Sequence, residues 1–166
     1  MPAIVDFCWK GGNKGGFPVR APPAIRKGGF VLCYTPVIMA YLGRRFGLMP
    51  SDPEAAAHVE QVLGVVTDAV AEGRLAFHPK DFFASHKTQV DESVPYIKQY
   101  GEQRLPKYLA HWEDILKHNP EGQGFMVGGS VTVADLAVYQ LPELWSECVA
   151  TVQPIKFCFK FCFIRH

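Results

Sequence analysis

The sequence predicts an α+β fold in which a short β-β-α unit is followed by an all-helical region. Glycine, proline and short strand-like apolar runs are concentrated in the first 48 residues, whereas long segments with helical spacing of apolar residues begin at Pro53. Met49–Pro53 has the composition of a linker. We therefore expect three parts, namely an N-terminal domain at 1–48, a helical domain at 52–150 and an irregular tail at 151–166.

Composition restricts the classes of partner. The 166 residues carry a net charge of +1 without a long run of one sign, so we expect neither nucleic acid nor a membrane as a partner. The five cysteines match neither a disulfide framework nor a zinc motif, and no histidine pair has metal-ligand spacing, so we expect no metal. No apolar stretch is long enough to span a bilayer, and the first residues do not resemble a signal peptide. A cytoplasmic location is the resulting expectation.

The N-terminal part is predicted to contain one hairpin. Residues 1–22 are rich in Gly and Pro and have the composition of a loop, with a short strand near Ile4–Phe7. Ala24–Arg26 and Phe30–Cys33 are short apolar runs on either side of Lys27-Gly28-Gly29. A Gly-Gly turn between two such runs is typical of a β-hairpin.

A helix is expected from Pro36 to about Phe46, because its apolar residues fall on one helical face and Gly47 stands at the C-cap position. Thr35 is expected to cap its free N–H groups, since Thr is a good N-cap and Pro suits the first turn. Helix N-termini bind carboxylates and phosphates. This segment is therefore either a binding site or simply a helix start.

Beyond the linker, apolar spacing predicts two long helices. The first extends from Pro53 to about Glu72, with Ser51 or Asp52 as its cap. The second extends from Pro95 to about Asn119 and is expected to kink or split at Pro106. Residues 73–93 between them are less regular.

A third helix is predicted from Val131 to about Val149. Thr132 is placed as its N-cap, and Asp135 lies three residues further on. The Asp135 carboxylate can therefore accept a hydrogen bond from the Thr132 N–H while the Thr132 side chain bonds forward into the first turn, which is a capping box. Val131 and Leu136 are placed as a hydrophobic staple. We interpret this motif as a structural helix nucleator and Asp135 as a structural rather than a catalytic carboxylate.

The Pro22-Pro23 pair before the hairpin and the tail after residue 150 are both unusual. A cis bond at Pro23 would turn the backbone groups of Pro22 toward an extended peptide, and a stiff loop is an equally good interpretation. The tail nearly repeats KFCF and is typical of a poorly packed edge, or of a truncated or altered reading of a longer gene.

Several motifs in the correct order carry a family resemblance. The stretches in the N-terminal part are Pro23–Gly28, Leu32–Ile38 and Tyr41–Gly43, and those in the helical part are GEQRLPKYLAHWEDILKHN, FMVGGS and VTVADLAVYQ. The first set resembles the second half of the thioredoxin-like domain of cytosolic glutathione S-transferases. The second set resembles the helical domain of their alpha/mu/pi/sigma-like branch. The resemblance covers about Phe17 to Val149 and implies a partial thioredoxin-like unit before an all-α C-terminal domain.

The resemblance implies a glutathione site. Pro22 would meet the cysteinyl backbone with its C=O, but it has no N–H for the second strand-like bond, while Pro23 is the structural cis-proline. Thr35 would hold the γ-glutamyl carboxylate with its hydroxyl and the helix N–H groups. Tyr34 stands where the family has the Gln or Glu that meets the γ-glutamyl amine. Asp68 would reach that amine across a dimer, or is simply a solvated helical carboxylate.

Weaker alignments complete the expected site. Trp9 and Lys14 fall near positions that hold the glycyl carboxylate, but their Gly-rich flanks make this alignment loose, and the alternative is a flexible loop. Phe77, Phe82 and Phe83 would form an apolar wall for a hydrophobic substrate.

The resemblance leaves the catalytic residue unknown. The family's first strand and helix carry the Tyr or Ser that stabilises the glutathione thiolate, and almost nothing of them fits into residues 1–12. We interpret the sequence as truncated at both ends, which leaves its status as an enzyme uncertain. The expected function is a homodimeric glutathione S-transferase-like protein that conjugates glutathione, its co-substrate, to hydrophobic electrophiles. The alternative is a non-catalytic remnant for glutathione binding, ligand binding or dimerisation.

Overall fold

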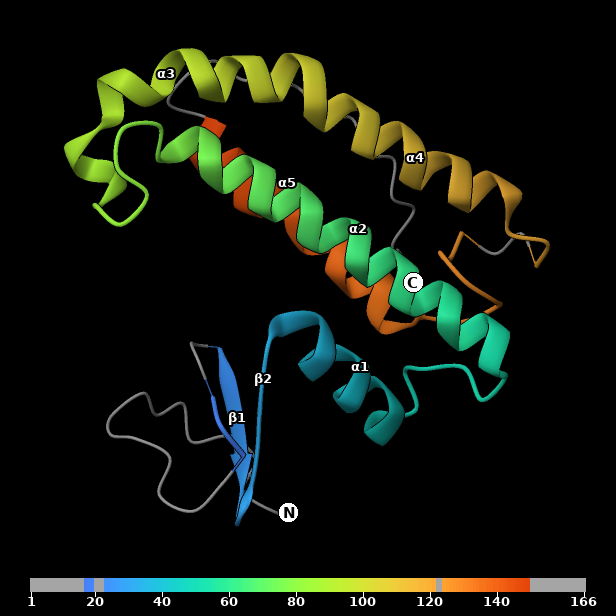
Figure 1. The fold of residues 1–166 in the computed structure, drawn as a ribbon. Helices are drawn as coiled ribbons and strands as arrows, with labels where there is room; N and C mark the ends of the chain where they lie inside the picture. The colour runs from blue at the N-terminus through green and yellow to red at the C-terminus, as the bar shows by residue number, and fades with distance from the viewer. Residues whose placement is uncertain (1–16, 20–22, 122–123, 150–166) are drawn as a thin grey trace.

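The computed structural model describes residues 17–19, 23–121 and 124–149, and within them a hairpin lies beside a group of helices (Figure 1). The predicted α+β architecture, with a β-β-α unit before an all-helical region, is confirmed. The strand expected near Ile4–Phe7 and the tail at 151–166 lie outside the described residues.

The hairpin forms as the sequence predicts. Strands β1 (Ala24–Lys27) and β2 (Phe30–Cys33) pair in antiparallel register and leave Gly28 and Gly29 as a two-residue loop. Gly28 has a φ of +58°, a left-handed conformation that glycine adopts without the steric cost of a side chain. The Gly-Gly dipeptide therefore sets the register of the hairpin.

Helix α1 (Thr35–Phe46) ends where predicted and starts differently. Gly47 has a φ of 71° and its N–H donates to the carbonyl of Gly43, which is a left-handed C-cap. Thr35 is not the N-cap, so that prediction is wrong. The cap position belongs to Tyr34, and no side chain makes a capping hydrogen bond. Thr35 is already in the helix and is the first helical residue, whereas a capping side chain belongs to the residue before it.

Helix α2 (Pro53–Phe77) is capped by Asp52, whose Oδ2 accepts a 2.8 Å hydrogen bond from the N–H of Ala55. It continues five residues beyond Glu72, the predicted end. The helix extends further than predicted because no proline interrupts it before Pro79.

The predicted second long helix is divided into three segments. They are α3 (Val90–Gln99), the π-helical η2 (Tyr100–Arg104) and α4 (Leu105–His118), and a 3₁₀ turn, η1 (His86–Thr88), precedes them. The predicted start at Pro95 is wrong, because this proline is tolerated inside α3, where it is exposed. The expected break near Pro106 is present. The N–H of Leu105 bonds to the carbonyl of Tyr100, five residues back, immediately before the proline that has no N–H.

The core lies between the helices, and α1 shares it. Helix α5 (Val133–Val149) lies alongside α2 (Figure 1), and the largest fully buried side chain is Trp112 of α4. Ala40 of α1 belongs to the same buried cluster. The N–H of Val133 donates to the carbonyl of Leu48 at 3.0 Å, which ties the start of α5 to the end of the N-terminal part.

Candidate functional site

The N-terminus of α1 brings Tyr34 and Thr35 together at the surface. Both residues are exposed, and the first turn contains no acidic side chain. The first helical hydrogen bond runs from Ile38 N–H to the carbonyl of Tyr34, and Pro36 has no N–H. The N–H groups of Thr35 and Val37 therefore lie at the positive end of the helix without a capping side chain, and this end is suited to an external carboxylate.

The backbone of Tyr34 is strained. Its φ is 79° and its ψ is 111°, and it is the single non-glycine residue with positive φ in the described part of the chain. A conformation of this kind costs about 1–3 kcal/mol and is concentrated at binding sites and switches. The strain at Tyr34 therefore supports a functional role for this turn.

A largely apolar cavity of about 390 Å³ adjoins the start of α1. Leu32 of β2, Val37 of α1 and Leu63 of α2 lie in its wall. Arg44 and Glu60 also line it and form an ion pair between α1 and α2. The helix start thus lies beside a space large enough for the apolar part of a small molecule.

Asp68 lies on α2, exposed and without an ion pair among the described residues. It is five residues beyond Leu63, so it lies about 7.5 Å further along the helix axis than the cavity wall. No hydrogen bond or ion pair in the described part of the chain joins it to Thr35. Its expected partner across a dimer is therefore not tested within one chain.

Three residues of the expected glutathione site, Pro22, Lys14 and Trp9, lie outside the described residues. Pro23 is exposed and immediately precedes β1. The conformation expected at this proline stays a prediction.

The three phenylalanines of the expected apolar wall have different environments. Phe77, at the end of α2, packs against the core, and its carbonyl contacts Nδ1 of His86 at 3.0 Å. Phe82 lies in the following loop beneath the guanidinium of Arg74, at 4.6 Å from the ring centre. Phe83 is 94% exposed. The 390 Å³ cavity is not lined by these rings, so their role as a wall stays a prediction.

At the start of α5, the side chains of Thr132 and Asp135 hydrogen-bond to each other and to the neighbouring backbone. Oδ2 of Asp135 accepts hydrogen bonds from both the N–H and the hydroxyl of Thr132, each at 2.8 Å. Oδ1 accepts from the N–H of Met126 at 2.7 Å, and Asp135 is fully buried. The Asp135 carboxylate therefore has both oxygens engaged in fastening the Gly-rich turn to the helix, which is a structural role.

Sequence reasoning missed a polar network that joins α2 to the end of η2 and the start of α4. Arg104 donates two hydrogen bonds of 2.7 Å to the carboxylate of Glu72, and the hydroxyl of Tyr108 donates a third at 2.8 Å. The bonds from Arg104 hold the pKa of Glu72 below its ordinary value. Burial, followed by the bond to Glu72, raises the pKa of Tyr108. Glu72 and Arg104 are 32 positions apart, so no local motif indicates the pair.

Metal binding and membrane insertion also bear on the site. The described residues contain no group of three His, Cys, Asp or Glu side chains placed to hold a metal ion. None of the helices in the described ranges is both long and apolar enough to cross a membrane.

Comparison with known proteins gives one consistent result. Residues 78–158 match the sequence profile of "Glutathione S-transferase, C-terminal domain". The chain is 31% identical to glutathione S-transferase 1 of Ascaris suum over 132 residues, covering 80% of this chain and 61% of the relative. It is 30% identical to glutathione S-transferase P 1 of Bufo bufo over 122 residues, covering 74% of this chain and 50% of the relative.

The structural comparison agrees. The glutathione S-transferase of Ascaris lumbricoides matches with a TM-score of 0.53 and 28% identity, over 76% of this chain and 58% of that protein. The chain thus spans between half and about three fifths of the length of these relatives. In sequence and in fold, the chain is similar to glutathione S-transferases, and residues 78–158 match their C-terminal domain.

Proposed function

We propose that the chain functions as a glutathione S-transferase of the alpha/mu/pi/sigma-like branch, in which glutathione thiolate attacks a hydrophobic electrophile. The observation that carries this proposal is the exposed, uncapped N-terminus of α1, placed directly after the hairpin and beside the 390 Å³ cavity. The similarity of the chain to the glutathione S-transferases of Ascaris suum and Bufo bufo supports the proposed reaction. A cytoplasmic location and a homodimer belong to the same proposal.

Each residue at the helix start has a distinct part in binding. The N–H groups at the start of α1 and the hydroxyl of Thr35 bind the γ-glutamyl carboxylate. Tyr34 presents a phenol to the γ-glutamyl amine, and Asp68 of the other subunit supplies the negative charge that an ammonium group needs. Pro22, Lys14 and Trp9 contribute the remaining contacts with the glutathione backbone and its glycyl carboxylate.

The chemical step needs a group that favours the thiolate over the thiol, because the thiolate is the nucleophile. We assign no residue to this role. Apolar side chains beside the helix start hold the electrophile and exclude water. Phe77, Phe82 and Phe83 contribute a further apolar wall to the binding site of the hydrophobic substrate.

A second candidate function is glutathione binding without turnover. It is favoured by the engagement of two tyrosines of the helical part. The hydroxyl of Tyr100 donates to the carbonyl of Ala69 and that of Tyr108 donates to the carboxylate of Glu72, so neither hydrogen is available to a thiolate.

Retention on immobilised glutathione, followed by a conjugation assay with an aromatic electrophile, separates the two candidates. Retention with turnover supports the transferase, and retention without turnover supports the binding protein. Thr35→Ala is expected to weaken retention about threefold or more, because it removes one hydrogen bond to a charged group. Thr88→Ala, which removes an exposed threonine hydroxyl far along the chain, is the matched control. Equal retention of the two variants would contradict the assignment of Thr35.

A further inference from the structure

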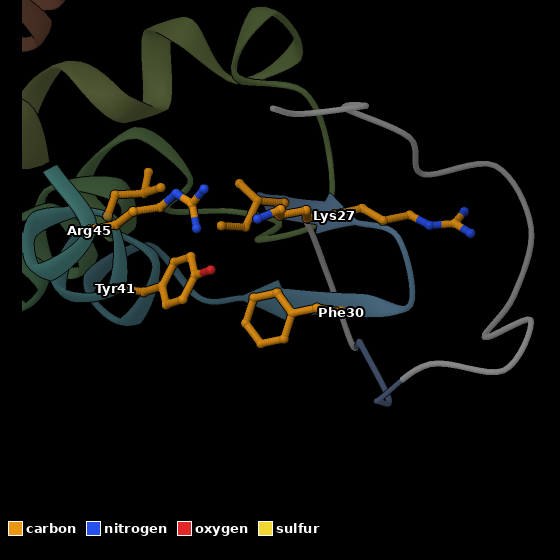
Figure 2. Close-up of a pocket in the computed structure, with 7 residues that line it drawn as sticks. Lys27, Phe30, Tyr41 and Arg45 are labelled. Atoms are coloured by element: carbon orange, nitrogen blue, oxygen red, sulfur yellow. The ribbon is translucent and has the colours of Figure 1, made fainter. Parts of the chain in front are cut away.

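A second recess lies toward the C-terminal end of α1; it shares Phe30 and Tyr41 with the 390 Å³ cavity, whereas Lys27 and Arg45 do not line that cavity. Its walls come from the hairpin and from the last two turns of α1, and Figure 2 shows its lining residues. Lys27 and Phe30 belong to the hairpin, while Tyr41 and Arg45 belong to α1. Arg45 is ten residues from Thr35, which corresponds to about 15 Å along the helix axis. Arg45 is therefore well separated from the start of α1, although the two cavities share Phe30 and Tyr41.

The charge of this recess has one sign. In Figure 2 the side chains of Lys27 and Arg45 point toward one another, and Arg26 also lines the recess. No carboxylate lines it, and within the described part of the chain neither Lys27 nor Arg45 is in an ion pair. The adjacent Arg44 is different, because it is paired with Glu60 of α2. Unpaired cations that converge from two elements repel one another, and an anion between them would remove that cost.

The floor of the recess is aromatic. The rings of Phe30 and Tyr41 have centroids 5.1 Å apart and an interplanar angle of 33°. Phe30 is 43% exposed, so part of its ring is accessible to a ligand. An accessible aromatic surface next to cationic groups is suited to a planar ring that carries negative charge.

The size of the recess limits how a ligand can enter. Its volume of about 20 Å³ is enough for one group of the size of a water molecule. An oxyanion could insert one oxygen here, while the rest of the ligand would lie on the surface against the aromatic rings.

We propose that this recess is a binding site for a phosphate monoester on a planar ring. The phosphate lies between Lys27 and Arg45, and the ring lies on Phe30 and Tyr41. The phosphate end of this site is distinct from the helix start used in the glutathione proposal, while Phe30 and Tyr41 also line the neighbouring cavity. The simpler alternative is that Arg45 is present because a cation stabilises the C-terminal end of a helix, with no ligand involved.

The test is a titration of the ¹⁵N-labelled full chain with phenyl phosphate at low salt, followed by amide chemical shifts. We expect saturable shifts at Lys27, Phe30, Tyr41 and Arg45, and their loss in 0.5 M NaCl, where exposed charges are screened. The double variant Lys27→Ala/Arg45→Ala should bind about fivefold more weakly, because two exposed charge contacts are lost. Lys107→Ala, which removes an exposed charge from α4, should bind as the unchanged chain does.

Two further probes separate the parts of the proposal. Inorganic phosphate and phenol should each bind more weakly than phenyl phosphate, because each makes half of the contacts. Equal affinity of the double variant and Lys107→Ala would overturn the proposal. Shifts confined to the start of α1 around Thr35 would also overturn it, since phenyl phosphate would then occupy the other end of the helix. The glutathione proposal is tested separately by retention of the Thr35 variant.

Discussion

The starts of α1 and α5 have similar sequences and opposite structures. Each contains a threonine followed by residues with helical spacing, and the sequence predicts a threonine cap in both. At α5, Thr132 is 3% exposed, its hydroxyl is engaged, and Asp135 fastens it from inside the helix. At α1, Thr35 is exposed, is already helical, and follows a strained residue. One helix start is closed by the chain itself, and the other is open.

The difference comes from the residue three positions later. Asp135 follows Thr132 at the spacing of a capping box, whereas the corresponding residue after Thr35 is the buried Ile38. A helix start without an internal carboxylate leaves its positive end available to an external one. An open start beside a cavity is therefore a better indication of a ligand site than the Thr-Pro motif itself.

Asp135→Ala should have the largest effect on stability. It leaves three buried donors unpaired, namely the N–H and hydroxyl of Thr132 and the N–H of Met126. We expect a loss of about 3 kcal/mol in the free energy of unfolding, measured by urea denaturation. The exposed Asp114→Ala is the control and should change stability by less than about 0.5 kcal/mol. A similar small change in both variants would show that the start of α5 is not held by its carboxylate.

Gly43→Val tests the contact between the C-terminal end of α1 and the start of α5. A Cβ at Gly43 would lie 3.0 Å from Cγ1 of Val133, the first residue of α5, and a valine adds two more carbons. We expect a loss of about 2 kcal/mol in unfolding free energy, because the helices cannot separate without losing shared core. Gly64→Val, at an exposed helical position with open space, provides the comparison for helix propensity alone. Equal losses would mean that the approach of α1 to α5 is not tight.

Local chemistry was enough to predict the hairpin, the end of α1 and the break before Pro106. Each depends on a residue with a strong backbone preference, such as Gly28, Gly47 or Pro106 itself. The sequence does not predict the start of α3, because a proline usually marks a helix boundary, whereas burial of Ser93 and Ile97 on the inner face keeps the helix intact through Pro95. Tertiary packing decided the outcome there.

The candidate site was predictable in part. The position of Thr35 follows from the order of the motifs, but its exposure and the positive φ of Tyr34 depend on how the chain leaves β2. The pair formed by Glu72 and Arg104 is a contact between two helices, and one sequence contains no signal for it. The recess at Lys27 and Arg45 likewise exists only once the hairpin packs on α1.

Tyr34→Gly tests whether the positive φ at the open start of α1 lowers the free energy of unfolding. Glycine adopts a positive φ freely, so the substitution should raise the unfolding free energy by about 1 kcal/mol, after allowing for the greater freedom of the unfolded chain. Gly29→Ala, at a glycine without positive φ, is a useful control for generic glycine effects in a turn. Destabilisation by Tyr34→Gly would mean that contacts of the ring outweigh the backbone strain.

The smallest stability effect is expected from Thr35→Ala, and the sharpest comparison is between this variant and Thr132→Ala. Thr132→Ala removes a buried capping hydroxyl and should cost about 1–2 kcal/mol without any bound ligand. Thr35→Ala removes an exposed hydroxyl at a position that makes no capping bond, so it should change stability by less than about 0.5 kcal/mol. Thermal unfolding with and without glutathione separates the two cases, because a ligand that binds the folded state stabilises it. Glutathione should stabilise the Thr132 variant as much as the unchanged chain, and the Thr35 variant less. If glutathione stabilises both variants equally, the open start of α1 is not where the γ-glutamyl carboxylate binds.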